Sequence, residues 1–221
     1  MSMSPATQCP PLIHDLLSRR FSPCAFEPRP VDQHHLLALF EAARWSASAG
    51  NEQPWSYIVA TRSESDEFAR MLDCVGRINL SWARLAAVLM IGCVRLSLQR
   101  GGLYPTAEHD LGLASASLVF EATARGLGVH QMTVIDREKI RDVYHVPTGI
   151  SVMTMLAIGY PEANPSATKT VTSDLRTPRF RKPLSSFVFS GAWSNAWLPA
   201  QATPHLEQAN ARLTPHSSCS R

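Results

Sequence analysis

Residues able to contact a ligand gather between Glu41 and Val59, in the sequence EAARWSASAGNEQPWSYIV. The middle of this stretch consists of small residues, so a flat ligand could lie directly against main-chain N–H and C=O groups. Asn51 and Gln53 add amide groups that both donate and accept hydrogen bonds. Pro54 and Trp55 then close the segment, and the tryptophan is a large apolar anchor. The pattern predicts a binding loop between a helix and a strand, although an ordinary connecting loop is the simpler alternative.

Basic residues form two further groups near the ends of the chain. Arg19 and Arg20 end a predicted helix over residues 11–20. The second group consists of Arg176, Arg179, Arg181 and Lys182. Each group could bind an anion. The alternatives are that the first pair complements the carbonyl end of its helix and that the second group is a solvated basic patch.

The composition describes an ordinary globular protein. Its 221 residues, 45% hydrophobic and 18% charged, suit one domain with extensions. The net charge of +3 is too small to favour nucleic acid as the main partner. The strongest apolar run, from Ala86 to Val94, is too short to span a membrane, and the first residues contain no apolar segment typical of a signal peptide. We therefore expect a cytoplasmic protein that binds neither nucleic acid nor membranes.

The cysteines and histidines show neither a metal-binding nor a disulfide pattern. The five cysteines are scattered and include no CxxC pair, and the eight histidines include no HExxH spacing. Reduced thiols are the simplest expectation for such cysteines. We expect no metal site.

Hydrophobic periodicity predicts interleaved helices and strands, and therefore an α+β fold. Helices are expected at 11–20, 36–45 with Asp32 as N-cap, 65–75, 79–85, 111–124 and 137–144 with Asp136 as N-cap. Strands are expected at 57–60, 87–94, 129–135 and 152–158. The helix at 111–124 is apolar nearly all round, which indicates a buried central helix that could pack against its copy in a dimer. The two glycines within 95–105 indicate a mobile loop or short lid.

The domain organisation follows from the same reading. Residues 1–191 are expected to form a single domain that ends in a polar, extended arm over about 162–191. The chain then becomes rich in Ser, Ala and Pro, so residues 192–221 are predicted to be a poorly ordered tail.

Five segments, in order and spacing, resemble the nitroreductase family of FMN-dependent oxidoreductases. They are RFSPCAFEPRPV (20–31), EAARWSASAGNEQPW (41–55), HDLGLASASLVFEATARGLGVHQM (109–132), MLAIGYP (155–161) and PRFRKPLSSFVF (178–189). The resemblance spans about residues 12–190. It implies a mixed sheet sandwiched by helices, in an intertwined homodimer whose C-terminal arm crosses to the partner. Two FMN molecules would lie at the subunit interface.

The resemblance also implies which residues bind FMN. Arg20 and Ser22 would hold the ribityl phosphate and the pyrimidine edge, and Phe21 would line the pocket. Arg179 and Arg181 match the C-terminal basic pair that clamps the phosphate. Guanidinium groups suit this role because they form strong, directional bonds with phosphate oxygens.

The predicted binding loop matches the family segment that covers the flavin from the other subunit. Ala47, Ser48 and Ala49 would lie along the ring system. Asn51 would support the loop, and Gln53 would lie close to the flavin edge.

A third group matches the family segments around the flavin ring. Asn79 would hydrogen-bond the isoalloxazine, and the backbone of Thr133 and Val134 would lie near N5, the atom that exchanges hydride. The sequence departs from the family pattern at Cys24, where a basic residue near the N1–O2 edge is usual. A cation there would stabilise the reduced flavin by at most about 4 kcal/mol, at about 4 Å and an effective dielectric near 20. Ala47 replaces a usual proline, and Val134 replaces a usual glycine.

The implied activity is hydride transfer from NAD(P)H through flavin N5 to a nitroaromatic, quinone or enone. No side chain is expected to act as an essential acid or base, because the flavin performs the chemistry. Two alternatives remain open. One is an FMN-dependent oxidase or dehydrogenase of a small metabolite that passes electrons to oxygen, and the other is a flavin-binding protein that has lost catalysis.

The phosphate assignment can be tested by mutation. We expect Arg181→Ala to weaken FMN binding by about 1.5–3 kcal/mol, because a charge-assisted hydrogen bond is lost. Titration of the purified protein with FMN measures this change. Unchanged affinity would show that Arg181 does not contact the phosphate.

Overall fold

In a computed structural model, which describes residues 13–162 and 181–197, the apolar run after Ala86 becomes β2 (Val88–Arg95). This strand lies inside a four-stranded sheet of order β1-β2-β4-β3. The other strands are β1 (Trp55–Thr61), β3 (Gly128–Met132) and β4 (Ile150–Gly159). Every pairing among these four strands is antiparallel.

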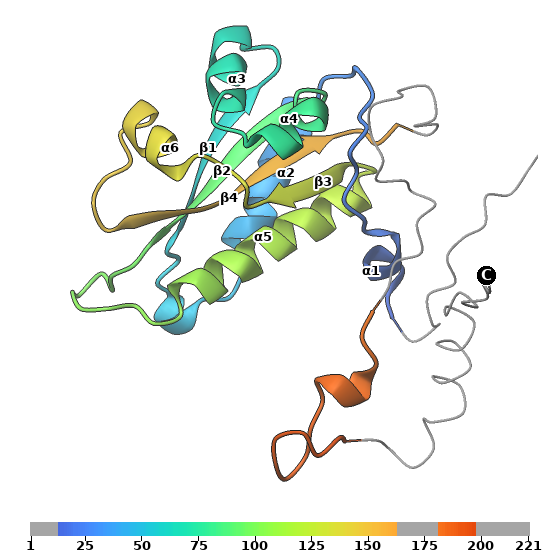
Figure 1. Cartoon of the computed structure of the whole chain (residues 1–221), viewed down its shortest axis with the longest axis vertical. Helices are drawn as coiled ribbons and strands as arrows, with labels where there is room; N and C mark the ends of the chain where they lie inside the picture. Colours follow the sequence, from blue (N-terminus) through green and yellow to red (C-terminus); the bar gives the residue numbers. More distant parts are fainter. Residues whose placement is uncertain (1–12, 163–180, 198–221) are drawn as a thin grey trace, which may run out of the picture. The chain divides into compact units, whose positions relative to one another are not determined.

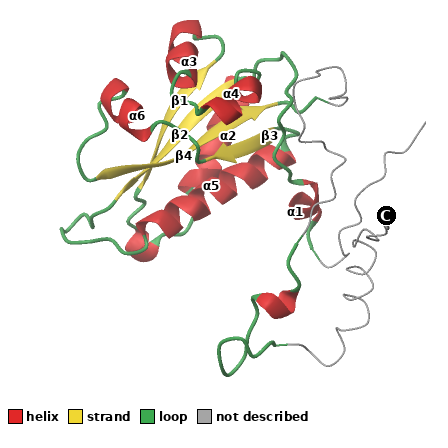
Figure 2. Ribbon diagram, in the orientation of Figure 1, coloured by secondary structure: helices red, strands yellow, loops and turns green. Residues whose placement is uncertain are grey.

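Helices cover both faces of the sheet (Figures 1 and 2). Those on one face are α2 (Gln33–Arg44) and α5 (Ala107–Ala124), and those on the other are α3 (Ser65–Leu72), α4 (Arg77–Ala83) and α6 (Arg137–Val143). Successive β2 residues alternate between the two cores, with Val88 and Met90 facing α2 and α5 and with Leu89 and Ile91 facing the opposite helices. This burial on both faces explains why β2 is continuously apolar. The predicted α+β class is confirmed.

The central helix α5 begins earlier than predicted and is covered on one side only. Ala114, Leu118 and Ala122 lie in the core. Gly112 and Leu113, by contrast, are exposed within the single chain. A nearly uncharged helix thus has one face against the sheet and a second face of small and apolar residues at the surface. Among the described helices, none has both the length and the apolar character needed to cross a membrane.

Two connections differ from the sequence-based expectation. Residues 95–105, expected to be a mobile loop or lid, form a small hairpin in which Ser97 and Leu103 are bridged. The strand predicted over 129–135 ends at Met132, because the chain then leaves β4 and contacts the segment before α4. There the Val134 carbonyl accepts a hydrogen bond from Gly76 N at 3.0 Å.

The described residues divide into two compact units, one of residues 15–162 and one that includes residues 13–14 and 181–197. The larger unit contains the sheet and begins with α1 (Asp15–Arg19). In the smaller unit, a short 3-10 helix, Leu184–Ser186, precedes a hairpin closed by a bridge between Phe189 and Ala196. This hairpin includes residues 192–197, which the sequence assigned to the tail. The remaining tail and residues 163–180 of the expected arm lie outside the described residues.

The three cysteines of the described part, Cys24, Cys74 and Cys93, are buried free thiols. Burial raises the pKa of Cys93 to about 11. Burial also raises the pKa of Cys74. The Cys74 and Cys93 thiols therefore remain protonated at neutral pH.

Two aspartates that the sequence identified as N-caps provide a matched test of the fold. The Asp136 carboxylate accepts a hydrogen bond from Lys139 N at 3.0 Å, whereas Asp32 stands at the N-cap of α2 without a side-chain capping bond. We expect Asp136→Ala to lower the free energy of unfolding by about 1 kcal/mol, the usual cost of a lost cap. Asp32→Ala should cost clearly less. Urea unfolding of both variants checks this difference, and equal losses would contradict it.

Candidate functional site

The predicted binding loop is a bent segment between α2 and β1. A single turn of 3-10 helix covers Ala49–Asn51. Gly50, Asn51 and Gln53 have φ values of 61°, 56° and 44°. For the two non-glycine residues this left-handed conformation carries strain, which the surrounding contacts must hold in place. The side chains of Ala47 and Ala49 are exposed, so the loop presents small side chains on a constrained backbone, as the sequence predicted.

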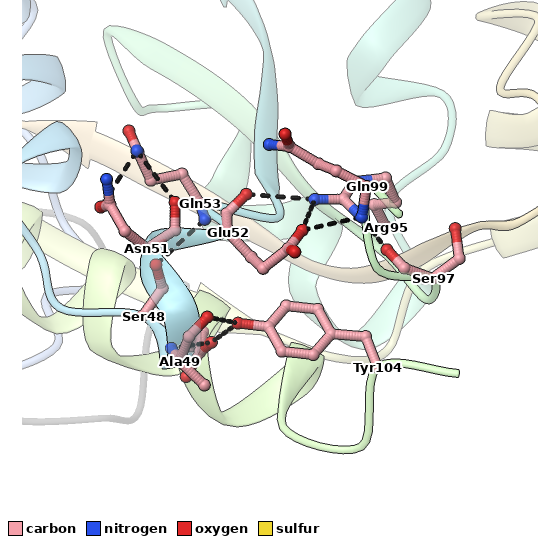
Figure 3. Close-up of polar contacts among 10 residues, drawn as sticks. Ser48, Ala49, Asn51, Glu52, Gln53, Arg95, Ser97, Gln99 and Tyr104 are labelled. Carbon is pink, nitrogen blue, oxygen red and sulfur yellow. Dashed lines mark hydrogen bonds and ion pairs between the residues drawn. The ribbon is translucent and has the colours of Figure 1, made fainter. Parts of the chain in front are cut away.

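The amide side chains of the loop bond within the loop itself (Figure 3). Gln53 Nε2 donates to Asn51 Oδ1 at 3.1 Å and to Asn51 O at 3.2 Å. Gln53 N donates to Ser48 Oγ at 3.0 Å. Asn51, Gln53 and Ser48 are therefore placed together, and in this structure they stabilise the turn that presents the alanines.

Glu52 connects the loop to the hairpin at 95–104. Its Oε2 accepts hydrogen bonds from Arg95 Nη2 at 2.8 Å and from Gln99 N at 2.9 Å, and its main-chain oxygen accepts from Arg95 Nη2 at 3.1 Å (Figure 3). Only 24% of the Arg95 side chain and 14% of the Glu52 side chain are exposed. The hydrogen bond from Arg95, followed by that from Gln99, lowers the pKa of Glu52. The hairpin is thus attached to the binding loop.

Tyr104 and Asp110 contact the loop from the side of α5. The Tyr104 hydroxyl lies 2.9 Å from Ala49 O and also donates to Asp110 Oδ2. Ala49 N donates to the same carboxylate oxygen at 3.1 Å. The sequence analysis did not identify either residue. The available signal was a pair of acidic residues, Glu108 and Asp110, in the first turn of a helix whose next ten residues carry no charge.

A second group of predicted residues lies where α1 meets the far end of α5. Arg20 Nη1 donates to Ser22 Oγ at 3.4 Å. Arg20 and Phe21 border a hollow of about 160 Å³. The remaining lining residues are Arg19, Thr123, Gly126, Leu127, Gly128 and Pro161. The Arg20 guanidinium and the Ser22 hydroxyl lie beside a hollow whose lining includes two glycines. These two groups are hydrogen-bond donors suited to a phosphate group.

Cys24 turns toward β3. It is only 6% exposed, and its Sγ lies 3.4 Å from His130 Nδ1. His130 Nδ1 also lies 3.0 Å from the Pro23 carbonyl oxygen, and the imidazole stacks on Trp82 with ring centroids 4.1 Å apart. The sequence analysis did not identify His130 as part of this site. At the position where a basic residue is usual, the structure thus has a buried thiol packed against an imidazole.

Asn79, Thr133 and Val134 lie together where β3 ends beside the start of α4, and their contact with FMN stays a prediction. Asn79 Nδ2 is 3.5 Å from Val134 O. A Cβ added to Gly76 would lie 2.6 Å from that same oxygen, so only glycine allows this close approach of backbones. Thr133 is exposed, and 47% of Val134 is exposed. The end of β3 therefore offers an amide and an apolar surface side by side.

The loop and the Arg20 group lie at opposite ends of α5 (Figure 1). Ser46 Oγ donates to Leu113 O at 3.0 Å, and Ala49 N bonds Asp110, whereas the Arg20 hollow includes Thr123. At 1.5 Å per residue, α5 rises about 20 Å from Asp110 to Thr123. Ala49 is therefore far from the Arg20 hollow of the same chain, although Ser46, the first residue of the loop, reaches the middle of α5, where its Oγ lies 2.6 Å from Ser117 Oγ.

The C-terminal basic pair is only partly described. Arg179 lies outside the described residues. Arg181 is exposed and belongs to the smaller unit. Its predicted role as a phosphate ligand stays a prediction.

Several known proteins resemble this chain. The model of the nitroreductase family matches residues 17–90. A provisionally named NADH dehydrogenase/NAD(P)H nitroreductase of Archaeoglobus fulgidus is 27% identical over 148 residues, which cover 62% of this chain and 78% of the relative. The 5,6-dimethylbenzimidazole synthase of Rhodospirillum rubrum is 27% identical over 159 residues, which cover 62% of this chain and 75% of the synthase.

One solved structure resembles this fold along most of the chain. It is a crystal structure of an oxidoreductase containing FMN, with 29% sequence identity and a TM-score of 0.78. The match covers 88% of this chain and 100% of the other.

The environment of His130 generates a prediction about pH. Burial lowers its pKa below the usual 6.5, although the Pro23 carbonyl opposes this shift, while Arg20 adds to it. The unfolded chain then binds this proton more readily than the folded chain. The stabilising contribution is present above pH 6.5 and is lost as the pH falls through the lower pKa of the folded state.

We expect the free energy of unfolding to decrease between pH 7 and 5, with a smaller decrease in His130→Gln. Urea unfolding at several pH values measures the slopes, and an NMR titration follows the imidazole directly. A folded-state pKa at or above 6.5 would contradict the assignment.

Proposed function

The chain belongs to the nitroreductase family, and from this we propose that it is an FMN-dependent oxidoreductase. It would take hydride from NADH or NADPH and deliver it to a small oxidised organic molecule such as a nitroaromatic, a quinone or an enone. The observation that supports this proposal most directly is a set of donors at the two ends of β3, with Arg20 and Ser22 near its start and Asn79 beyond its end.

The chemistry of these residues fits FMN. The Arg20 guanidinium and the Ser22 hydroxyl suit the charged phosphate end, since charge-assisted hydrogen bonds to phosphate oxygens are strong. Asn79 can donate to or accept from the polar edge of a flavin ring. The exposed alanines of the binding loop allow close approach to a flat surface.

FMN, when bound, supplies the hydride transfer. The protein would bind and orient the two reactants. Arg20 and Ser22 would neutralise and fix the phosphate, and Asn79 would set the ring orientation. The exposed backbone at Thr133 and the apolar side chain of Val134 would exclude water from one edge of the site.

We further propose that each site is shared between two copies of this chain. Ala49 bonds Asp110 at the start of α5, and the Arg20 hollow includes Thr123 about 20 Å further along the helix, so these two parts would contact different ligands within one chain. The surface of α5 that carries Gly112 and Leu113 is apolar and exposed, as expected of a helix that packs against another subunit. A homodimer would bring the loop of one chain to the β3 side of the other.

One observation favours an FMN-dependent oxidase as a second candidate function. Cys24 places a buried thiol where a basic residue is usual, and the pKa of the adjacent His130 is lowered by burial. Neither residue supplies a positive charge at neutral pH, so a reduced flavin near this position would be less stabilised and more readily oxidised by oxygen. The similarity to 5,6-dimethylbenzimidazole synthase also shows that not every relative is named as a reductase.

The visible spectrum of the purified protein tests the proposal. We expect a yellow protein. The visible absorption of its bound flavin should disappear when NADH or NADPH is added without oxygen, because the flavin accepts the hydride. Its mass in solution should be twice that of the chain. Reduction by neither nucleotide would favour the oxidase, and a protein unable to take up added FMN would contradict the proposed function.

A further inference from the structure

The carboxylate of Asp110 is the only charged side chain that the described part of the molecule buries, and it is 2% exposed. It belongs to the first turn of α5, which follows Thr106. Burying a charge is costly unless hydrogen bonds compensate for the lost water. The partners of this carboxylate therefore indicate what its burial achieves.

Three groups surround the carboxylate. Ala49 N donates to Oδ2 at 3.1 Å, the Tyr104 hydroxyl donates to the same oxygen, and His109 Nδ1 lies 3.2 Å from Oδ1. The hydroxyl is also 2.9 Å from Ala49 O, so its one proton is shared between two acceptors. Asp110 and Tyr104 thus hold both polar groups of one loop residue.

The charge states are suited to this role. Burial alone would raise the pKa of Asp110, but the hydrogen bonds from Tyr104, His109 and Ala49 outweigh burial and lower the pKa. Burial and then the bond to Asp110 raise the pKa of Tyr104. At neutral pH the carboxylate is therefore ionised and the phenol keeps its proton.

The loop residue that they hold is one of the small residues that face outward. The Ala49 side chain is exposed, while its backbone is bonded from the side of α5. The next residues, Gly50 and Asn51, adopt left-handed conformations. Fixing the Ala49 peptide therefore fixes where this strained turn begins.

We propose that Asp110, assisted by Tyr104, is a positioning residue that holds the loop at 46–53 in the shape that receives the flat face of the ligand. This inference rests on the proposed function, because it takes the ligand to be FMN. Asp110 does not contact the ligand. It acts through the Ala49 peptide, whose outer side forms part of the binding surface.

Two tyrosine variants provide a matched comparison. Tyr104→Phe removes the hydroxyl that contacts Asp110 and the loop. Tyr57→Phe removes a hydroxyl that lies 3.0 Å from Ser115 Oγ, also on α5 but without a contact to the loop. Asp110→Asn keeps the size of the side chain and one acceptor oxygen, and Asp110→Ala keeps neither.

The measurements are the FMN dissociation constant, the visible spectrum of bound FMN and the hydrogen exchange of the Ala49 amide, all well below the melting temperature of each variant. We expect the dissociation constant to rise about fivefold in Tyr104→Phe and about tenfold or more in Asp110→Ala, with Asp110→Asn between wild type and Asp110→Ala. Exchange of the Ala49 amide should accelerate in the same order. Tyr57→Phe should leave all three measurements unchanged, even if it lowers stability.

The inference is overturned if Tyr104→Phe and Asp110→Asn match Tyr57→Phe in FMN affinity and in Ala49 exchange. If wild type binds no FMN, the proposed function fails, but exchange at Ala49 still shows whether Asp110 holds the loop. If Asp110→Ala does not fold, the two milder variants decide the question.

Discussion

The length of one helix constrains the whole candidate site. Because α5 is a straight, packed helix whose two ends carry different parts of the predicted ligand-binding set, those parts cannot approach each other within one chain. The loop at 46–53 lies against the first half of α5 through Ser46 and Ala49, and the Arg20 hollow lies against the other half. The proposed assembly of two chains follows from this distance and from the apolar outer surface of the same helix.

The loop itself is stabilised from several directions. Asp110 and Tyr104 hold its backbone from α5, and Glu52 joins it to Arg95 on the adjoining hairpin. A segment with so little side-chain volume cannot be fixed by hydrophobic packing, so polar contacts to neighbouring elements take that role. The small residues that allow a ligand to approach are therefore also the reason that buried polar partners are needed behind them.

Local patterns in the sequence predicted the fold well. A continuous apolar run indicated β2, a long segment that is apolar nearly all round indicated α5, and Asp136 was predicted to cap α6, as it does. Asp32 also stands at a helix N-cap, but its side chain makes no capping bond. The sequence identifies the capping position because it depends on neighbouring residues, whereas the direction of the side chain depends on the surrounding structure.

The sequence predicted the residues of the binding loop, but it did not predict the residues that contact the loop and Cys24 from other elements. Asn51, Gln53 and the alanines were evident because they are adjacent in the sequence. Asp110 contacts a residue 61 positions away, and His130 contacts Cys24 across 106 positions. No local pattern reports such pairs, since they arise only when α5 and β3 pack into place. The roles of Arg179 and Arg181 remain predictions for a similar reason.

The buried thiols have a consequence for the lifetime of such a protein in air. A reduced flavin that meets oxygen can release hydrogen peroxide, which attacks the thiolate form of cysteine. Burial keeps Cys74 and Cys93 protonated, and it also removes Cys24 from the surface. The three cysteines in the described part of the chain should therefore resist oxidation by this peroxide during turnover.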